Sequence, residues 1–239
     1  MVTSLAPQQI GEYLRLLSSG IQVTITLTVV SGLLCIVVAV VAGVARLSNW
    51  RVIRTSAGIF IEFFRGTNAI VQLFWAFYSL PLLGIYLSPM SAAIIVLSLN
   101  AGAYGAEIVR GAIQAVPLGQ REASMALNMK STTMITRVIL PQAYPAMVPP
   151  FTNLLIELLK TTPLVSLITI SDMTFVGDTI RTRTGDNDTV FILLFVLYFA
   201  LAICIAALGR MLERIPKYRR TPSTSRRQAR VKHDLEVAP

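Results

Sequence analysis

The chain has 239 residues, of which 54% are apolar and only 14% are charged, and its formal net charge at pH 7 is +9. Because soluble proteins carry about a quarter of charged residues, this composition excludes an ordinary water-soluble domain. Two cysteines in separate apolar runs and one histidine, His233, exclude a disulfide framework and a histidine-based metal or catalytic centre.

Long uncharged runs separate the charges and predict an all-α membrane protein with five transmembrane helices. A helix needs about 20 apolar residues to cross the hydrocarbon core of a bilayer. The longest run, Gly66–Ala106, has 41 residues, which is enough for two spans joined by a turn. The predicted spans cover about residues 21–45, 55–81, 90–111, 140–160 and 189–212.

Three segments outside the spans carry separate predictions. Residues 1–19 are polar and mildly amphipathic, and we place them on the extracytoplasmic side, with Pro7 opening a short helix. Residues 161–176 are apolar but too short to span, so we expect a re-entrant or interfacial segment that packs into the protein. The basic tail, residues 213–239, is rich in Ser, Arg and Pro, and we expect it to be disordered.

The positions of lysine and arginine predict the orientation in the membrane. Three arginines follow the first span, four basic residues follow the third, and nine lie from Arg210 onward. Only Arg15, Arg181 and Arg183 lie on the opposite side, and short loops rich in Lys and Arg stay in the cytoplasm. We therefore expect the N-terminus outside and the C-terminus inside, with the tail near anionic lipids rather than on nucleic acid.

A polar segment before the fourth span predicts a cytoplasmic helix that docks on a soluble partner. Residues 117–141 read PLGQREASMALNMKSTTMITRVILP, and their composition favours a helix from Gly119 to Met129. Leu118, Met125 and Met129 can form an apolar patch, and such a patch suits a groove on another protein.

This segment resembles the EAA loop of bacterial ABC-transporter permeases, which reads EAA, three residues, Gly, nine residues and I-x-L-P. The matching positions are Glu122, Ala123, Ser124, Asn128, Val138, Leu140 and Pro141. Serine replaces the second alanine, and Asn128 replaces the glycine. Because asparagine is the most tolerant residue after glycine for the left-handed conformation, we expect the turn at Asn128 to survive.

Three further stretches resemble the polar amino acid permease family: FRGTNAIVQLFW (64–75), AYGAEIVRGAIQAVPLGQ (103–120) and NLLIELLKTTPLVSL (153–167). With the loop, the matches cover about residues 20–212. The stretches ALNM, RGTNAIVQLFW and LLIELLKTTPLVSLITISDMTF look most like a permease of ectoine/hydroxyectoine uptake systems. The resemblance therefore favours ectoine or hydroxyectoine as substrate, with a polar amino acid such as glutamine, histidine or arginine as the alternative.

The resemblance implies a type I ABC importer permease fold, with residues 20–212 as the membrane domain and 118–141 as the coupling loop. It implies a heterodimer with a second, similar permease, two ATPase subunits and an extracytoplasmic solute-binding protein in a bacterial cytoplasmic (inner) membrane. ATP and Mg²⁺ would bind the ATPase, so this chain would be no enzyme and would hold no cofactor or metal. The implied ATPase-coupling residues are Leu118, Gln120, Glu122, Ala123, Ser124, Met125, Asn128 and Met129, with a solvated Glu122 as the alternative.

Polar side chains inside the third and fourth spans suggest a substrate pathway. Asn100 and Tyr104 share one helix face, as do Glu157 and Lys160 on the next span. Ionisable groups inside a transmembrane span usually face a protein interior or a water-filled cavity. A carboxylate and an ammonium close together suit a small zwitterion. The predicted pathway residues are Asn100, Tyr104, Glu157, Lys160 and Thr161.

Structural alternatives stand beside this interpretation. Glu157 and Lys160 could neutralise one another, Asn100 could form an interhelical hydrogen bond, and Glu62 with Arg65 fits an edge pair. Pro149 and Pro150 lie near the middle of the fourth span, where they favour either a hinge or a static kink.

Two rival functions remain at this point. A secondary transporter or channel usually shows internal repeats, and none is visible in this chain. A scaffold that only anchors an ATPase is the second rival, whereas an intramembrane enzyme lacks any catalytic constellation, including a GxxxxGK[ST] loop.

Overall fold

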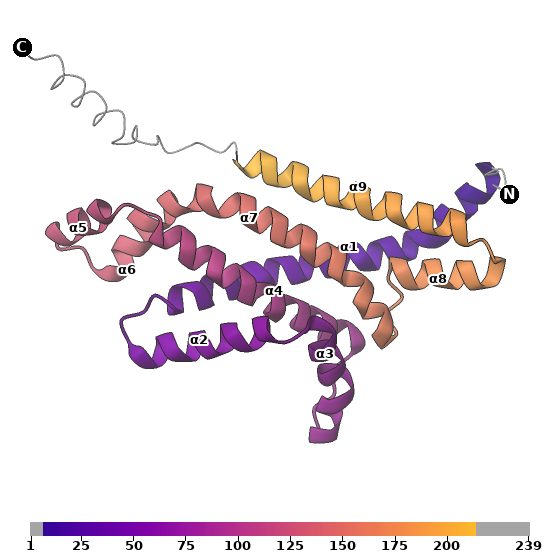
Figure 1. Ribbon diagram of the computed structural model, residues 1–239, viewed down its shortest axis with the longest axis horizontal. Coiled ribbons are helices and arrows are strands. Elements are labelled where there is room, and N and C mark those ends of the chain that lie inside the picture. Colours follow the sequence, from indigo (N-terminus) through magenta and orange to yellow (C-terminus); the bar gives the residue numbers. More distant parts are fainter. Residues whose placement is uncertain (1–6, 214–239) are drawn as a thin grey trace, which may run out of the picture.

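The computed structural model describes residues 7–213, and every regular element in that range is a helix. Figure 1 shows an elongated bundle in which the long helices run along one axis. Residues 1–6 and the predicted disordered tail beyond Glu213 lie outside the described range.

Within the described residues, four helices are long and apolar enough to cross a membrane, and they coincide with four of the five predicted spans. The third of them continues a short helix, α6 (Ser131–Met134), through a π-helical turn, η3 (Ile135–Ile139). The four are α1 (Pro7–Ala45), α4 (Pro89–Gln114), α7 (Leu140–Thr161) and α9 (Asn187–Glu213).

The first helix is longer than the sequence suggests. Pro7 opens it, as expected for a residue favoured in the first turn, but α1 then runs unbroken for 39 residues. Residues 7–19 therefore form one helix with the first span rather than a separate short one. At 1.5 Å per residue its length is about 58 Å, which exceeds the roughly 30 Å hydrocarbon core of a bilayer.

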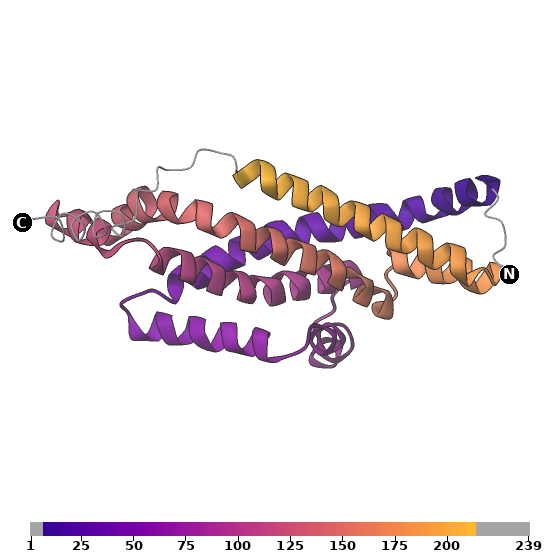
Figure 2. The same cartoon turned by 45° about the horizontal axis from the view of Figure 1, so that its top comes forward.

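The expected continuous helix over residues 55–81 is broken after Gly66. α2 (Arg51–Gly66) ends there, and Thr67 and Asn68 are extended. The Asn68 side chain then caps the next helix, because its Oδ1 accepts a hydrogen bond of 2.9 Å from the Ile70 amide. The chain continues through α3 (Ala69–Phe74), η1 (Trp75–Ser79) and η2 (Leu80–Leu83), which cross the long axis and are seen end on in Figure 2.

The core forms where α1 packs along α4. Small residues on α4 permit this close approach, and Ala101, Ala103 and Ala106 are all buried. At Gly102 even a methyl group would clash, since a Cβ there would lie 2.6 Å from Val38 Cγ1. The interface between these two helices is therefore fixed by residue size rather than by polar contacts.

The apolar segment after α7 packs into the protein, as predicted. It forms a 3₁₀-helix, η4 (Thr162–Ile168), in which Val165 and Ile168 are fully buried. A bend then leads into α8 (Met173–Thr184), which packs against α1 and α9.

The basic segments gather at one end of the molecule. In Figures 1 and 2 the link from α1 to α2 lies at the same end as α6 and the helix before it, α5 (Leu118–Ala126). The start of α1 and all of α8 lie at the other end. The two basic segments within the described residues, the link after α1 and the segment around α5, are thus neighbours in space.

Candidate functional site

Helix α5 overlaps the segment Gly119–Met129, where the sequence predicts a docking helix, and it lies at one end of the molecule (Figure 1). It ends at Ala126, three residues earlier than predicted. The buried Ser124 donates a 2.7 Å hydrogen bond to the Gln120 carbonyl, and the Gln142 amide on α7 donates one of 3.2 Å to Gln120 Oε1. Helix α5 is therefore tied to the start of α7.

The turn after α5 is a Schellman motif centred on Asn128. Asn128 has a φ of 52°, in the left-handed region, as predicted for the residue at the glycine position. Its amide donates to the Met125 carbonyl at 2.9 Å, and the Met129 amide donates to the Ser124 carbonyl at 3.1 Å. These two bonds satisfy carbonyls that the helix end leaves free, so the motif ends α5 and redirects the chain.

The free surface of α5 is largely apolar. Leu118 and Met125, both predicted, are 71% and 62% exposed, and Leu127, which the sequence analysis did not select, is 76% exposed. Met129 is only half-buried rather than part of the open patch, whereas Glu122 and Ala123 are exposed. Within the described chain no hydrogen bond or ion pair involves Glu122, so its carboxylate faces outward.

Arg121 was missed by the sequence analysis. Its Nη2 donates a 3.2 Å hydrogen bond to the Ile113 carbonyl, which joins α5 to the last turn of α4. An arginine beside the EAA positions could have indicated such a bond, because arginine readily reaches the free carbonyls at a helix end.

Asn100 forms interhelical hydrogen bonds, which the sequence analysis gave as the structural alternative to a place in the substrate pathway. Its amide donates to the Phe64 carbonyl at 3.0 Å and to Gln72 Oε1 at 3.2 Å. The Gln72 amide in turn donates to the Phe64 carbonyl at 3.0 Å and to the side chain of Thr67. These two amides hold the break between α2 and α3, and Gln72 was not among the predicted site residues.

Tyr104 lies one turn further along α4 and contacts Arg65. Its hydroxyl donates to the Arg65 carbonyl at 3.4 Å, and the Arg65 guanidinium carbon lies 5.4 Å from the centre of the Tyr104 ring. The described contacts contain no Glu62–Arg65 pair, so Arg65 stacks on an aromatic ring instead. On the same helix, Glu107 and Arg110 form an ion pair of 2.6 Å.

The polar row on α7 lies on an open face. Asn153, Glu157 and Lys160 are all exposed, while Leu154 and Leu158 on the opposite side pack in the core. No ion pair joins Glu157 to Lys160 among the described residues. Thr161 donates a 2.7 Å hydrogen bond to the Glu157 carbonyl. Both charges therefore remain available to a ligand or to a neighbouring subunit.

Pro145, Pro149 and Pro150 lie inside α7, which stays one helix from Leu140 to Thr161. They follow the π-helical turn η3, and Leu140 and Pro141 of the loop motif form the first turn of α7. The chain from α5 thus reaches the proline-containing helix through the turn at Asn128, α6 and the π-helical turn η3.

A buried carboxylate, Asp172, was also missed. Its Oδ atoms accept hydrogen bonds from the Thr174 and Phe175 amides at 3.2 and 3.0 Å, which caps α8. Tyr198 of α9 donates to the same carboxylate at 3.4 Å and shares a 2.9 Å hydrogen bond with the Thr174 hydroxyl. Burial raises the pKa of the Asp172 carboxyl. A lone Asp just before a helix is a usual N-cap signal, and it could have revealed this position.

The arrangement is suited to binding and movement. The part of the chain that the structure describes contains no group of three or more His, Cys, Asp or Glu placed to hold a metal ion. It presents an exposed, largely apolar helix at one end, and α7 carries a row of exposed polar side chains, Asn153, Glu157 and Lys160.

Comparison with known proteins adds independent findings. Residues 35–217 match the family described as "binding-protein-dependent transport system inner membrane component". The chain is 44% identical over 208 residues to a probable amino-acid ABC transporter permease protein of Sinorhizobium fredii, with 84% of this chain and 87% of that protein covered. It is 36% identical over 200 residues to the L-cystine transport system permease protein of Bacillus subtilis, covering 83% and 86%.

The fold is also similar to a solved structure. A crystal structure described as an amino acid ABC transporter with histidines matches with a TM-score of 0.80 and 30% sequence identity. The match covers 89% of this chain and 99% of that one.

Proposed function

The chain belongs to the family of binding-protein-dependent transport system inner membrane components, and from this premise we propose that it carries a polar amino acid inward across a bacterial cytoplasmic membrane. It is a multi-pass membrane protein and the permease subunit of an ABC amino-acid importer. It is not an enzyme, since separate ATPase subunits hydrolyse ATP in such importers.

The substrate class rests on one observation above all, the 44% identity to a probable amino-acid permease over most of both chains. The similarity to an L-cystine permease and to an amino acid transporter structure supports the same class. The relatives therefore favour the alternative substrate of the sequence analysis, a polar amino acid, over ectoine or hydroxyectoine, which motif resemblance alone suggested.

The importer has ATPase and solute-binding-protein partners, as membership of this family implies. Its full composition in our proposal is this chain, a second similar permease, two ATPase subunits that hold ATP and Mg²⁺, and the binding protein. In this proposal the N-terminus lies outside, and α2 contributes the second crossing, while the helical stretch Ala69–Leu83 lies across the long axis. The clustering of the basic segments at one end supports this orientation.

Polar side chains of α7 and α4 supply the proposed pathway. Glu157 and Lys160 offer opposite charges on an open face of α7, which suits the two charged groups of an amino acid. Asn100 and Tyr104 line α4 beside the break after Gly66, and Thr161 ends the row on α7. Pro149 and Pro150 supply the bend that lets α7 follow movement of the docking helix α5.

Uptake into proteoliposomes tests this proposal. The complete importer would be reconstituted with ATP inside, and uptake of labelled cystine, histidine, glutamine, arginine and ectoine would be compared with and without the binding protein. We expect ATP-dependent uptake of an amino acid that excess ectoine does not block. Uptake that ectoine alone inhibits would overturn the substrate class, and uptake that follows an ion gradient without ATP would overturn the importer itself.

A complex that lacks this chain distinguishes a permease from a scaffold, because uptake that persists without the chain would show that it only anchors the ATPase. The matched control is the complete complex with Ala123→Asp in α5, which keeps every span but places a charge on the docking surface.

A further inference from the structure

The short connector between η4 and α8, residues 169–172, runs from one apolar core of the molecule to another. Ile170 belongs to an inner core that includes Leu97 of α4. Met173, three residues later, belongs to an outer core that includes Leu17 of α1, at the end of the molecule opposite α5 (Figures 1 and 2). The two clusters of buried side chains share no residue, so the connector links two separately packed parts of the chain.

Buried polar groups lie where the connector meets α1 and α9. Thr24 and Asp172 are both fully buried, and the Met173 amide donates a 3.1 Å hydrogen bond to Thr24 Oγ1. Tyr198 donates to the Asp172 carboxylate at 3.4 Å and shares a 2.9 Å hydrogen bond with the Thr174 hydroxyl. Neither ion pair among the described residues includes Asp172, so hydrogen bonds alone satisfy this buried carboxylate. Because water can replace each of these bonds, such a boundary opens at a lower cost than an apolar one.

The backbone of the connector is strained at Thr169. Its φ of 66° lies in the left-handed region, which a β-branched residue rarely adopts. The Thr169 side chain is exposed, and its hydroxyl donates to the adjacent Ile168 carbonyl at 2.7 Å. Because this bond is local, the packing of the residues on either side must hold the strained turn in place. Strain of this kind clusters in switch regions, where it lowers the cost of leaving one conformation for another.

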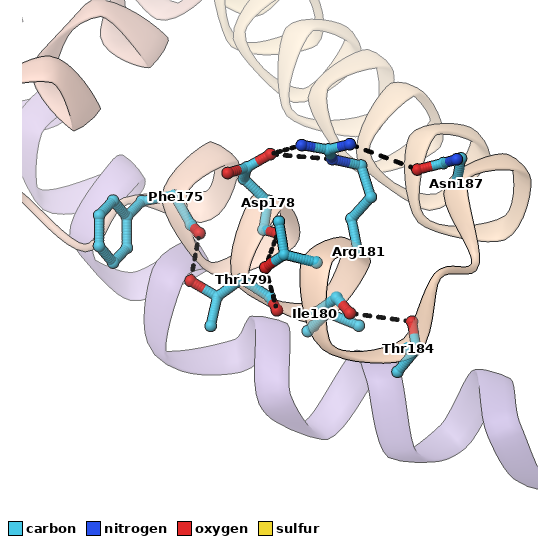
Figure 3. Close-up of polar contacts among 8 residues, drawn as sticks. Phe175, Asp178, Thr179, Ile180, Arg181, Thr184 and Asn187 are labelled. Carbon is cyan, nitrogen blue, oxygen red and sulfur yellow. Dashed lines mark hydrogen bonds and ion pairs between the residues drawn. The ribbon is translucent and has the colours of Figure 1, made fainter.

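Each end of the connector continues into an ordered element. On the inner side, η4 follows directly after Lys160 and Thr161, the proposed pathway residues at the end of α7. On the outer side, α8 is bonded largely to itself, as Figure 3 shows. Arg181 pairs with Asp178 at 2.7 Å, and threonine hydroxyls along the helix donate to carbonyls of the same helix. A change of backbone conformation at the connector would therefore move these two elements relative to one another without distorting either.

We propose that residues 169–172 form a strained latch, which is closed in the described conformation and opens once in each transport cycle. When closed, it holds α8 against α1 and α9 through the hydrogen bonds of Asp172 and Met173. Opening relaxes the left-handed turn at Thr169 and releases those bonds, so that η4 and the adjoining end of α7 move relative to the outer core. The inference rests on the proposed function, because it takes the transport cycle from it.

Thr169→Gly tests the strain directly, because glycine adopts the left-handed turn without a steric cost. This variant favours the closed latch, so we expect a higher unfolding temperature of the purified importer together with about fivefold slower ATP-driven uptake. The matched control Thr169→Val keeps the β-branched strain and removes only the hydroxyl, and its uptake should equal that of the wild type. A merely structural turn predicts stabilisation by Thr169→Gly with unchanged uptake, and that result would overturn the proposal.

Hydrogen exchange measures the opening in the wild-type importer, without any substitution. The complete importer with its binding protein would be compared without nucleotide and after trapping with ATP and vanadate. The closed latch protects the amides of Met173, Thr174 and Phe175, so their exchange rates should differ at least about tenfold between the two states. The helical segment 101–106 of α4 is the internal control and should exchange alike in both.

Uptake by the same preparation keeps two possible failures apart. Equal protection of the three amides in both states of an importer that transports would overturn the latch and leave the proposed function intact. A wild-type importer that shows no ATP-driven uptake at all would overturn the proposed function and the latch with it.

Discussion

Asn128 shows how a single residue carries both the family resemblance and the local geometry. Its position in the loop motif normally belongs to glycine, and its φ of 52° explains why, since few other residues adopt the left-handed conformation without strain. The Schellman bonds around it then fix where α5 ends. Asp172, Gln72 and Arg121 act in the same local manner, because each satisfies backbone groups that a helix end or break leaves free.

Substitutions at Asn128 should separate this backbone role from side-chain chemistry. Asn128→Gly keeps the left-handed turn, so we expect wild-type thermal stability and normal retention of the ATPase. Asn128→Val places a β-branched residue there, and we expect a loss of about 1–2 kcal/mol with weaker ATPase retention. Thermal unfolding of the purified importer and co-purification of the ATPase measure both effects. Equal behaviour of the two variants would show that the turn is not required.

Lys160 provides a second prediction at this scale. Lys160→Ala removes one charge of the proposed pathway, and we expect about a tenfold fall in amino-acid uptake with unchanged assembly, as for loss of one charge-assisted hydrogen bond. Lys160→Arg keeps the charge and serves as the control, with uptake nearer to wild type. Normal transport by Lys160→Ala would return this residue to a structural or neutral role.

The elements α5, η3 and α7 form one continuous route from the docking surface into the membrane. Helix α5 is hydrogen-bonded to α7 through Gln120 and Gln142 and to α4 through Arg121. We propose that its apolar patch converts movement of a bound ATPase into movement of α4 and α7. The break after α2 is instead held in place, since two side-chain amides bond to an irregular backbone beside the proposed pathway.

Two substitutions on the exposed surface of α5 test its docking role. Ala123→Asp places a carboxylate in the proposed interface, and we expect at least about a tenfold loss of ATPase affinity because a buried unpaired charge is costly. Glu122→Ala should weaken docking less, since it removes one exposed carboxylate. Co-purification and ATP-driven uptake are the measurements. If both variants retain the ATPase and transport normally, α5 is not the docking helix.

At the scale of the whole molecule, the two ends of the bundle differ in chemistry. One end carries the basic link after α1 and the apolar docking helix α5, and the other carries α8 with its polar outer face. This polarity is what an importer needs, because an ATPase and a binding protein must contact opposite sides of the membrane at the same time.

The orientation can be measured directly in intact cells. In a Cys204→Ser background, we expect a membrane-impermeant thiol reagent to label Thr182→Cys from outside and Thr132→Cys only after permeabilisation. Cys35 is buried and should stay unlabelled in both variants. The reverse pattern would invert the proposed topology while leaving the family membership intact.

The sequence by itself determined the features that depend on composition and on short stretches of the chain. Apolar runs specify the long helices α1, α4, α7 and α9, because a bilayer requires about 20 apolar residues whatever their neighbours. The loop motif likewise located α5 and the turn at Asn128, since helix caps and left-handed turns are local.

Only the tertiary structure decided which polar groups meet across the chain. The amides of Asn100 and Gln72 are 28 residues apart, and Met173 bonds Thr24 across 149 residues, so neither contact has a local signature. The same holds for the break after Gly66: the uncharged run there reads as continuous span material, yet the amide of Asn100, from another helix, joins that of Gln72 in satisfying the interrupted backbone. Hydropathy is a property of each residue alone, whereas these contacts depend on which side chains of other helices the fold places beside it.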